Sequence, residues 1–172
     1  MKLDINKIEL KKICENIFQI YHDGTILKFN CPKLLAPFGI DTEYNKQLLR
    51  LELDENNNSE IIHFKKVILH IENLIKKKLN ITDDEFKSII RKRNNKCDVL
   101  EVRLKTMKDR ILTDIEYQDK ENNYLKTIYD LPKQSYLKLN LEINGLWDYR
   151  TDKKEKNKCG LTVYTTKIFV LI

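Results

Sequence analysis

LKLNLEINGLWDYR, residues 137–150, and CGLTVYTTKIFV, residues 159–170, are the two segments that decide the fold of this chain. In the first segment an apolar residue stands at every second position from Leu137 to Ile143, and the residues between them are polar. In the second, aliphatic residues alternate with threonine and tyrosine in the same way. Two runs with a period of two residues, joined by the polar loop TDKKEKNK, predict a β-hairpin.

The sole tryptophan, Trp147, lies at the inner end of this hairpin loop, beside Tyr149 and Arg150. Aromatic rings on a sheet stack with bases and neighbouring cations neutralise phosphates, as in platforms for single-stranded nucleic acid. Strand parity argues the other way, because positions 143, 145 and 147 share the face of the core leucines. A bulge at Gly145 would reverse this parity. The sequence therefore leaves the indole either stacking on bases or filling the core, and Tyr164, opposite in phase to its aliphatic neighbours, is the better surface candidate.

The composition is that of a modestly basic globular protein. The chain has 172 residues, of which 41% are hydrophobic and 34% charged, and its formal net charge is +6. This length fits one domain over residues 1–172, and the charge permits a polyanionic partner without demanding one. Lys, Asn and Ile are abundant and Ala36 is the only alanine. Because AT-rich coding produces the same bias, the number of lysines alone is weak evidence for nucleic-acid binding.

Several classes of function lack support in the sequence. The four cysteines form no CxxC pair and have no histidine at ligand spacing, so we expect reduced, buried thiols and no zinc site. No glycine-rich phosphate loop, nucleophile elbow or metalloprotease motif is present, so we expect neither an enzyme nor a cofactor. No apolar run approaches the length of a membrane span, and the first residues lack a signal-peptide core. We therefore expect an intracellular protein without membrane contact.

Before the terminal hairpin, period-two runs alternate with polar turns. They predict strands at about Lys12–Tyr21 and Thr25–Asn30, around a turn at His22–Gly24, and then at Gln47–Leu53, Phe86–Arg93, Asp98–Thr106, Leu112–Gln118 and Tyr124–Ile128. A helix is expected where apolar residues recur at helical spacing from Ile61 to Ile75, with Ser59 as its N-cap. Thr82–Glu85 would begin a short second helix. Seven or eight mostly antiparallel strands with one inserted helix predict a mainly β fold, an OB-fold-like antiparallel Greek-key barrel.

Arginine, which is scarce in this chain, gathers on one predicted hairpin. Arg91, Lys92 and Arg93 lie on its first strand, and Arg103 and Lys105 lie on its second. Such a row is either a phosphate-binding rail or a solvated strand face, and the scarcity of arginine favours the rail. The lysine-rich loop of the terminal hairpin serves equally well as a soluble loop tip or as an electrostatic finger for nucleic acid. Its lysines are Lys153, Lys154, Lys156 and Lys158.

Two short motifs connect these features to a known family. One is FNCPKLLAPFG, from Phe29 to Gly39, and the other combines GLWDY at 145–149 with GLTVY at 160–164 and Lys167-Ile168. Together they resemble the OB-fold single-stranded DNA-binding proteins of large DNA viruses, which are similar in design to the T7-type phage single-stranded DNA-binding protein. The resemblance spans the chain from about Thr25 to Val170. It implies non-enzymatic binding and protection of single strands in viral DNA replication, recombination or repair.

The resemblance points to Phe38, Trp147 and Tyr149 as motif residues. Its implied partners are single-stranded DNA, replication proteins and a second copy of the chain, in the cytoplasm (viral factory) or the nucleus of an infected cell. The phage proteins end in a flexible acidic tail, whereas the last four residues here are expected to be strand. The nucleic-acid-binding candidates from all these observations are Phe38, Arg91, Arg93, Arg103, Lys105, Lys138, Trp147, Tyr149, Arg150 and Tyr164.

Two alternative functions stay open at this point. A structural or virion-associated protein would keep the OB-like barrel without binding DNA, and a fully buried Trp147 with dispersed lysines would favour it. A small nucleic-acid enzyme, or its accessory subunit, would need a cluster of buried carboxylates that holds a divalent metal.

Overall fold

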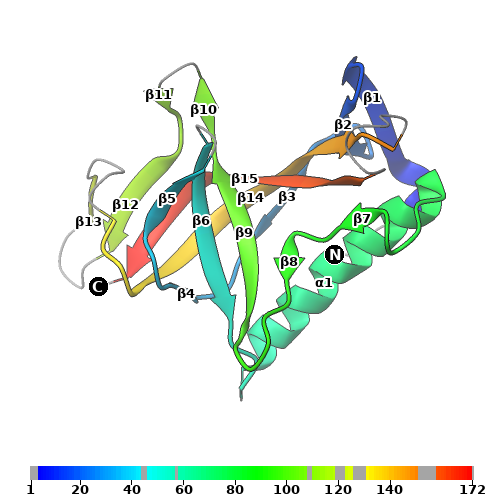
Figure 1. Cartoon of the computed structure of the whole chain (residues 1–172). Helices are drawn as coiled ribbons and strands as arrows, with labels where there is room; N and C mark the ends of the chain where they lie inside the picture. The colour runs from blue at the N-terminus through cyan, green and yellow to red at the C-terminus, as the bar shows by residue number, and fades with distance from the viewer. Residues whose placement is uncertain are drawn as a thin grey trace.

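The computed structural model describes residues 4–43, 46–56, 58–107, 110–118, 123–125, 131–150 and 158–171 (Figure 1). Within them, a 3-10 helix η1 (Ile5–Lys7) precedes the first strand, and α1 (Ser59–Leu79) follows the sixth. The strands are β1 (Ile8–Cys14), β2 (Ile17–His22), β3 (Leu27–Asn30), β4 (Leu34–Ala36), β5 (Ile40–Glu43), β6 (Lys46–Leu53), β7 (Phe86–Lys87), β8 (Ile90–Arg91), β9 (Asp98–Leu104), β10 (Thr106–Met107), β11 (Arg110–Ile111), β12 (Asp114–Gln118), β13 (Asn123–Leu125), β14 (Ser135–Asp148) and β15 (Cys159–Leu171).

Five of these strands close into a ring. β14 pairs antiparallel with β4, β4 with β6, and β6 with β9. β15 completes the circuit, because it pairs antiparallel with β14 over most of its length and parallel with β9 at Tyr164↔Arg103 and Thr165↔Leu104. The predicted fold class is confirmed, since the molecule is mainly β, with an OB-like barrel and α1 inserted between β6 and β9. The prediction did not include the parallel pairs that β15 forms with β7, β9 and β12.

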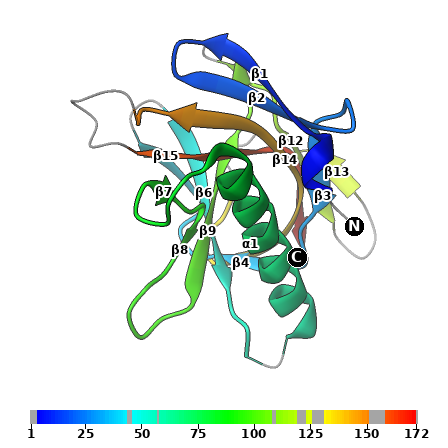
Figure 2. The same cartoon turned by 90° about the vertical axis from the view of Figure 1, so that its right-hand side faces the viewer.

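The alternation in β14 and β15 places one face of each strand in the core. From Leu137 to Ile143 the alternate apolar side chains of β14 are at most 1% exposed, and Ile168 and Val170 of β15 are at most 2% exposed. α1 lies against one side of the barrel (Figure 2). Its buried face contains the predicted helical stripe, namely Ile61, Phe64, Ile68, Ile71 and Ile75.

A buried carboxylate also joins α1 to the strands beside it. Glu72 is 2% exposed and accepts hydrogen bonds from Ser88 Oγ and from the backbone N–H of Ile89 at 2.8 Å. Burial raises the pKa of Glu72, although these two donors oppose the shift. The carboxylate therefore holds the segment between β7 and β8 against the helix.

One predicted element near the start of the chain differs from the structure. Lys12–Tyr21 is not one strand, because the chain reverses at Glu15–Asn16 and β1 pairs antiparallel with β2. The next turn is confirmed, with Asp23 and Gly24 both at positive φ. The reversal forms an exposed hairpin with the apolar residues Ile13 and Ile17 at its tip.

Side-chain hydrogen bonds explain the other local differences. Asn58, not Ser59, caps α1, because its side chain accepts the N–H of Ile61. Thr82–Glu85 forms a turn rather than a helix, since the Glu85 carboxylate accepts both the N–H and the hydroxyl of Thr82.

The predicted strand at 86–93 is split: β7 pairs with β15, and only β8 pairs with β9. The β12–β13 hairpin forms as predicted, and residues 126–128 lie outside the described chain.

All four cysteines are free. Cys31 and Cys159 are buried as predicted, and burial raises the pKa of these thiols to about 12 and to about 11, respectively. Cys14 is exposed at the end of β1, which contradicts the expectation of a buried thiol.

Candidate nucleic-acid interface

A bulge in β14 decides the orientation of Trp147. Ile143 pairs with Val163, but Gly145 pairs with Thr162, so Asn144 is an extra residue in β14. The bulge reverses the strand parity: Leu146 turns into the core at 1% exposed, and Trp147 turns to the outer face, where it is partly exposed. Of the two placements that the sequence left open, the structure shows the outward one.

Trp147 lies in a groove of about 490 Å³ on the outer side of the barrel. The floor of the groove belongs to β14 and β15. The β1–β2 and β10–β11 hairpins rise on opposite sides of these strands (Figure 1), and β2 and β9 supply side chains to the two walls. Its aromatic lining residues are Phe18, Trp147, Tyr149 and Tyr164, and its basic ones are Lys46 and Arg103. Among the described residues that line the groove, none is acidic.

Cross-strand pairing explains how the groove residues come together. Trp147 pairs with Ile17 on one side and with Gly160 on the other. Gly160 has no side chain to lift the indole: a Cβ atom there would lie 2.6 Å from Cζ2 of Trp147. Tyr164 pairs with Arg103 across the parallel closure of the ring, so the aromatic and basic residues of the floor are direct neighbours.

No residue that the structure describes forms an ion pair with either cation of the groove. The positive charge of Arg103 lowers the pKa of Lys46, which shows that the two side chains feel each other's field. Two adjacent unpaired cations in a groove without carboxylates form a site for an anion.

A second, smaller cavity of about 70 Å³ continues from this groove. It shares Arg103, Trp147 and Thr162 with the groove and reaches Arg91 and Lys87. Arg91 is 44% exposed in its side chain and contacts Glu101 at 2.9 Å, so its charge is partly balanced. The basic surface therefore extends past Trp147 toward β8, where the ion pair of Arg91 with Glu101 reduces its positive charge.

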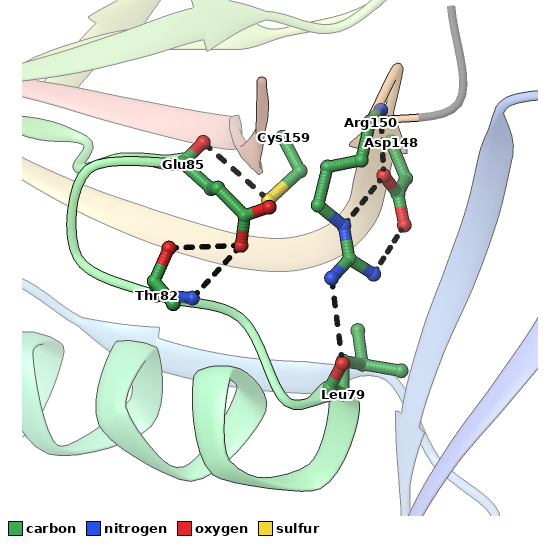
Figure 3. A network of polar contacts seen from close by, with 6 residues as sticks. All are labelled: Leu79, Thr82, Glu85, Asp148, Arg150 and Cys159. Carbon is green, nitrogen blue, oxygen red and sulfur yellow. Dashed lines mark hydrogen bonds and ion pairs between the residues drawn. The ribbon is translucent and has the colours of Figure 1, made fainter. Parts of the chain in front are cut away.

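Two arginines that the sequence predicts to bind nucleic acid are bonded instead to other groups of the protein. Arg93 donates to the backbone carbonyl of Cys97 and to Glu52, each at 2.7 Å. Arg150 contacts Asp148 through two nitrogens, at 3.0 and 2.9 Å, and donates to the carbonyl of Leu79 at 3.5 Å (Figure 3). Both guanidinium groups lie outside the groove lining, and of the predicted rail (Arg91, Lys92, Arg93, Arg103 and Lys105) only Arg103 lines the groove.

The remaining candidates also include residues that are ion-paired or that lie away from the groove. Lys105 is ion-paired with the buried Glu142 at 3.4 Å. Lys138 and Phe38 are exposed but lie away from the groove lining. Lys153, Lys154 and Lys156 fall outside the described residues. The structure thus brings Arg103, Trp147, Tyr149 and Tyr164 together, and a nucleic-acid role for every candidate stays a prediction.

The polar network in Figure 3 positions the aromatic pair of the groove. Arg150 joins the end of β14 to the last turn of α1, and the backbone N–H of Asp148 donates to Asn16 at 2.9 Å. The N–H of Tyr149 donates to the backbone carbonyl of Lys158, the residue just before β15. Trp147 and Tyr149, whose ring centroids are 6.2 Å apart, are therefore held from both sides. Asp148 and Arg150 act on the groove indirectly, by fixing the backbone beside it.

Several groove residues were not found from the sequence. Lys46 is one of many lysines, and no local pattern marks it. Phe18 and the exposed Ile13 and Ile17 belong to the β1–β2 hairpin, for which the sequence pattern predicts a single strand. The sequence signal for this wall is the polar pair Glu15-Asn16, which can form a turn between the apolar residues Ile13 and Ile17.

Within the described residues there is no group of three or more His, Cys, Asp or Glu side chains able to hold a metal ion. The same part of the chain has no helix with the length and apolarity that membrane crossing requires.

No protein-family model and no curated protein sequence matches this chain. Among solved structures, the chain is similar to gp2.5, a single-stranded DNA binding protein encoded by bacteriophage T7. The TM-score is 0.42 and the sequence identity is 10%, over 86% of this chain and 87% of that chain. Values this low carry no conclusion about the function of this chain.

Proposed function

We propose that this protein binds single-stranded DNA, without catalysis, in the groove over β14 and β15, and so protects single strands in replication, recombination or repair. The composition of the groove carries the proposal. It combines four aromatic side chains with two unpaired cations and contains no acidic residue among its described lining, although the whole chain has 26 Asp and Glu residues. A ligand that presents planar rings and repeated negative charges fits this combination.

The geometry favours a single strand over a duplex. Unpaired bases expose their faces and can stack on Trp147 and Tyr164, whereas a duplex hides those faces between neighbouring base pairs. Arg103 and Lys46 stand beside the rings, where the phosphates of a stacked strand would pass. Because stacking and phosphate contacts do not read base edges, the binding should tolerate most sequences.

A purely structural role finds less support. That role would be favoured by an indole buried in the barrel and by scattered cations. Instead Leu146 fills the barrel, Trp147 lines the groove, and Lys46 and Arg103 lie together. The family resemblance of the 29–39 and 145–164 motifs also favours DNA binding over a purely structural role.

The test is a fluorescence-anisotropy titration with matched single-stranded DNA, single-stranded RNA and duplex DNA at two salt concentrations. We expect the protein to bind the single strand more tightly than the duplex. The double variant Arg103→Ala/Lys46→Ala should bind more weakly, and its log–log salt slope should shrink by about 1.4, at about 0.7 for each lost phosphate contact.

The matched control is Lys66→Ala/Lys77→Ala, which removes the same charge from exposed positions of α1. We expect its affinity and its salt slope to stay close to those of the wild type. Equal weakening by both double variants would mean that net charge, rather than the groove, attracts the strand. Equal affinity for duplex and single strand would contradict the stacking role, and absence of binding at low salt would refute the proposed function.

A further inference from the structure

We infer that the nucleic-acid-binding surface continues beyond the groove to a second aromatic and basic cluster, the distal patch, at the other end of β14 and β15. The distal patch consists of Lys33, Tyr136, Lys138, Lys167 and Phe169. This inference rests on the proposed function and adds a second contact region for the same strand.

Register places the distal patch on the same outer face as the groove. Tyr136 and Lys138 occupy the outward phase of β14, since the residues that alternate with them are buried. Lys138 pairs with Phe169 on β15, next to the buried Ile168 and Val170. Outward-facing positions continue at every second residue along β14. The bulge at Asn144 shifts them by one residue, so that Trp147 also faces outward. One face of the long hairpin therefore carries both clusters.

The distal patch repeats the chemistry of the groove. Tyr136 is 47% exposed, and Lys33 Nζ lies 4.5 Å from the centroid of its ring. Lys167 Nζ lies 4.8 Å from the ring centroid of Phe169 and also contacts Glu116 at 2.6 Å. Among the described residues, Lys33 and Lys138 have no ion-pair partner. An exposed ring with two unpaired cations beside it offers a base a stacking face and a phosphate its counter-charge.

The face between the two clusters does not repel a polyanion. On β14 the acidic residue between them is Glu142, which is 4% exposed. Its carboxylate contacts Lys28 at 3.1 Å and Lys105 at 3.4 Å, so two cations offset one negative charge. Lys28 keeps 68% of its side chain exposed and remains accessible to a phosphate.

The distance suits one strand that contacts both clusters. Tyr136 and Trp147 are separated by roughly 35 Å along β14, at about 3.3 Å per residue. OB folds occupy about 4–16 nucleotides of single strand. A short oligonucleotide would therefore fill the groove alone, and a longer one would reach the distal patch.

The experiment compares fluorescein-labelled oligothymidylates of roughly six and roughly sixteen nucleotides, the two ends of that range. The variant Tyr136→Ala/Lys138→Ala should keep wild-type affinity for the short oligonucleotide and lose about tenfold for the long one. The variant Lys33→Gln/Lys138→Gln keeps the ring, and we expect it to flatten the salt slope for the long oligonucleotide only. The control Lys66→Ala/Leu69→Ala removes a lysine and an exposed apolar side chain from α1 and should change neither affinity.

The outcomes separate this inference from the proposed function. If the wild type binds both lengths and Arg103→Ala/Lys46→Ala weakens both, the groove role stands. Unchanged binding of the long oligonucleotide by the distal variants then refutes the extension alone. If the wild type binds neither oligonucleotide, both proposals fail. If sedimentation shows that the distal variants lose self-association while their DNA binding is unchanged, the patch joins copies of the chain, which also overturns the inference.

Discussion

Replacing Trp147 by alanine tests how the bulge in β14 is used. The indole lies on the outer face, against Gly160 and 6.2 Å from the ring of Tyr149, so its removal takes a stacking surface out of the groove. Loss of one base–aromatic stack costs about 1–3 kcal/mol of binding, which weakens the affinity for a single strand by roughly 5- to 150-fold. Anisotropy titration measures this loss directly.

The same substitution should cost little stability. A tryptophan that fills a core loses about 3–5 kcal/mol of unfolding free energy when cut to alanine. Here Leu146 occupies the core and the indole is partly exposed, so we expect about 1–2 kcal/mol in urea titrations followed by circular dichroism. In the wild type, the fluorescence of this sole tryptophan should be quenched when an oligonucleotide binds.

The neighbouring residue supplies the control. Leu146→Ala should show the opposite pattern, with about 2–5 kcal/mol lost from unfolding and normal affinity of the folded fraction. Trp147→Phe keeps an aromatic face and should retain most of the affinity. A Trp147→Ala variant that loses more than about 3 kcal/mol of stability and binds normally would refute an outward, stacking indole.

Two further predictions concern Arg93 and Arg150, whose guanidinium groups are bonded to other groups of the protein. Arg93→Ala should lower the unfolding free energy by about 1–2 kcal/mol in urea, because its hydrogen bonds to Glu52 and the Cys97 carbonyl are lost; a large loss of DNA affinity at unchanged stability would contradict this. Arg150 holds the pKa of Asp148 below its ordinary 3.8. The carboxylate therefore contributes stability above that pH, and the contribution is lost as the pH falls through the lowered pKa. In a plot of the urea midpoint against pH, Asp148→Asn should flatten the acid side. An unaltered acid side would contradict the stabilising role of the Arg150–Asp148 ion pair.

The regular parts of the barrel could be predicted because they follow one-dimensional patterns. The alternation from Leu137 to Ile143 and the helical stripe from Ile61 to Ile75 state which face is buried, and the structure buries those faces. The terminal hairpin, the turn at Asp23–Gly24 and the helix insertion follow from the same local rules. Parallel closure could not be predicted, because Tyr164 and Arg103 meet through register rather than through sequence.

The site was less predictable because it depends on single residues. One extra residue, Asn144, decides whether Trp147 points into or out of the barrel, and the sequence marks it only by the glycine that follows. Arg150 looks like a phosphate contact beside an aromatic pair, yet its partner Leu79 is remote in sequence. Lys46 reaches the groove from a strand whose own pattern says nothing of the aromatic residues opposite it.

The closure of the ring also sets an order on biosynthesis. β15 is the partner that both β14 and β9 need, and its contact with β9 consists of two residue pairs. While a ribosome is still making the chain before Cys159, the edges of β9 and β14 have no partner there, and unpaired strand edges invite association with other chains. Folding of the barrel must therefore await this strand, and pairings so distant in sequence are formed slowly. A cell that makes this protein quickly would need to shield those edges for the interval before the ring closes.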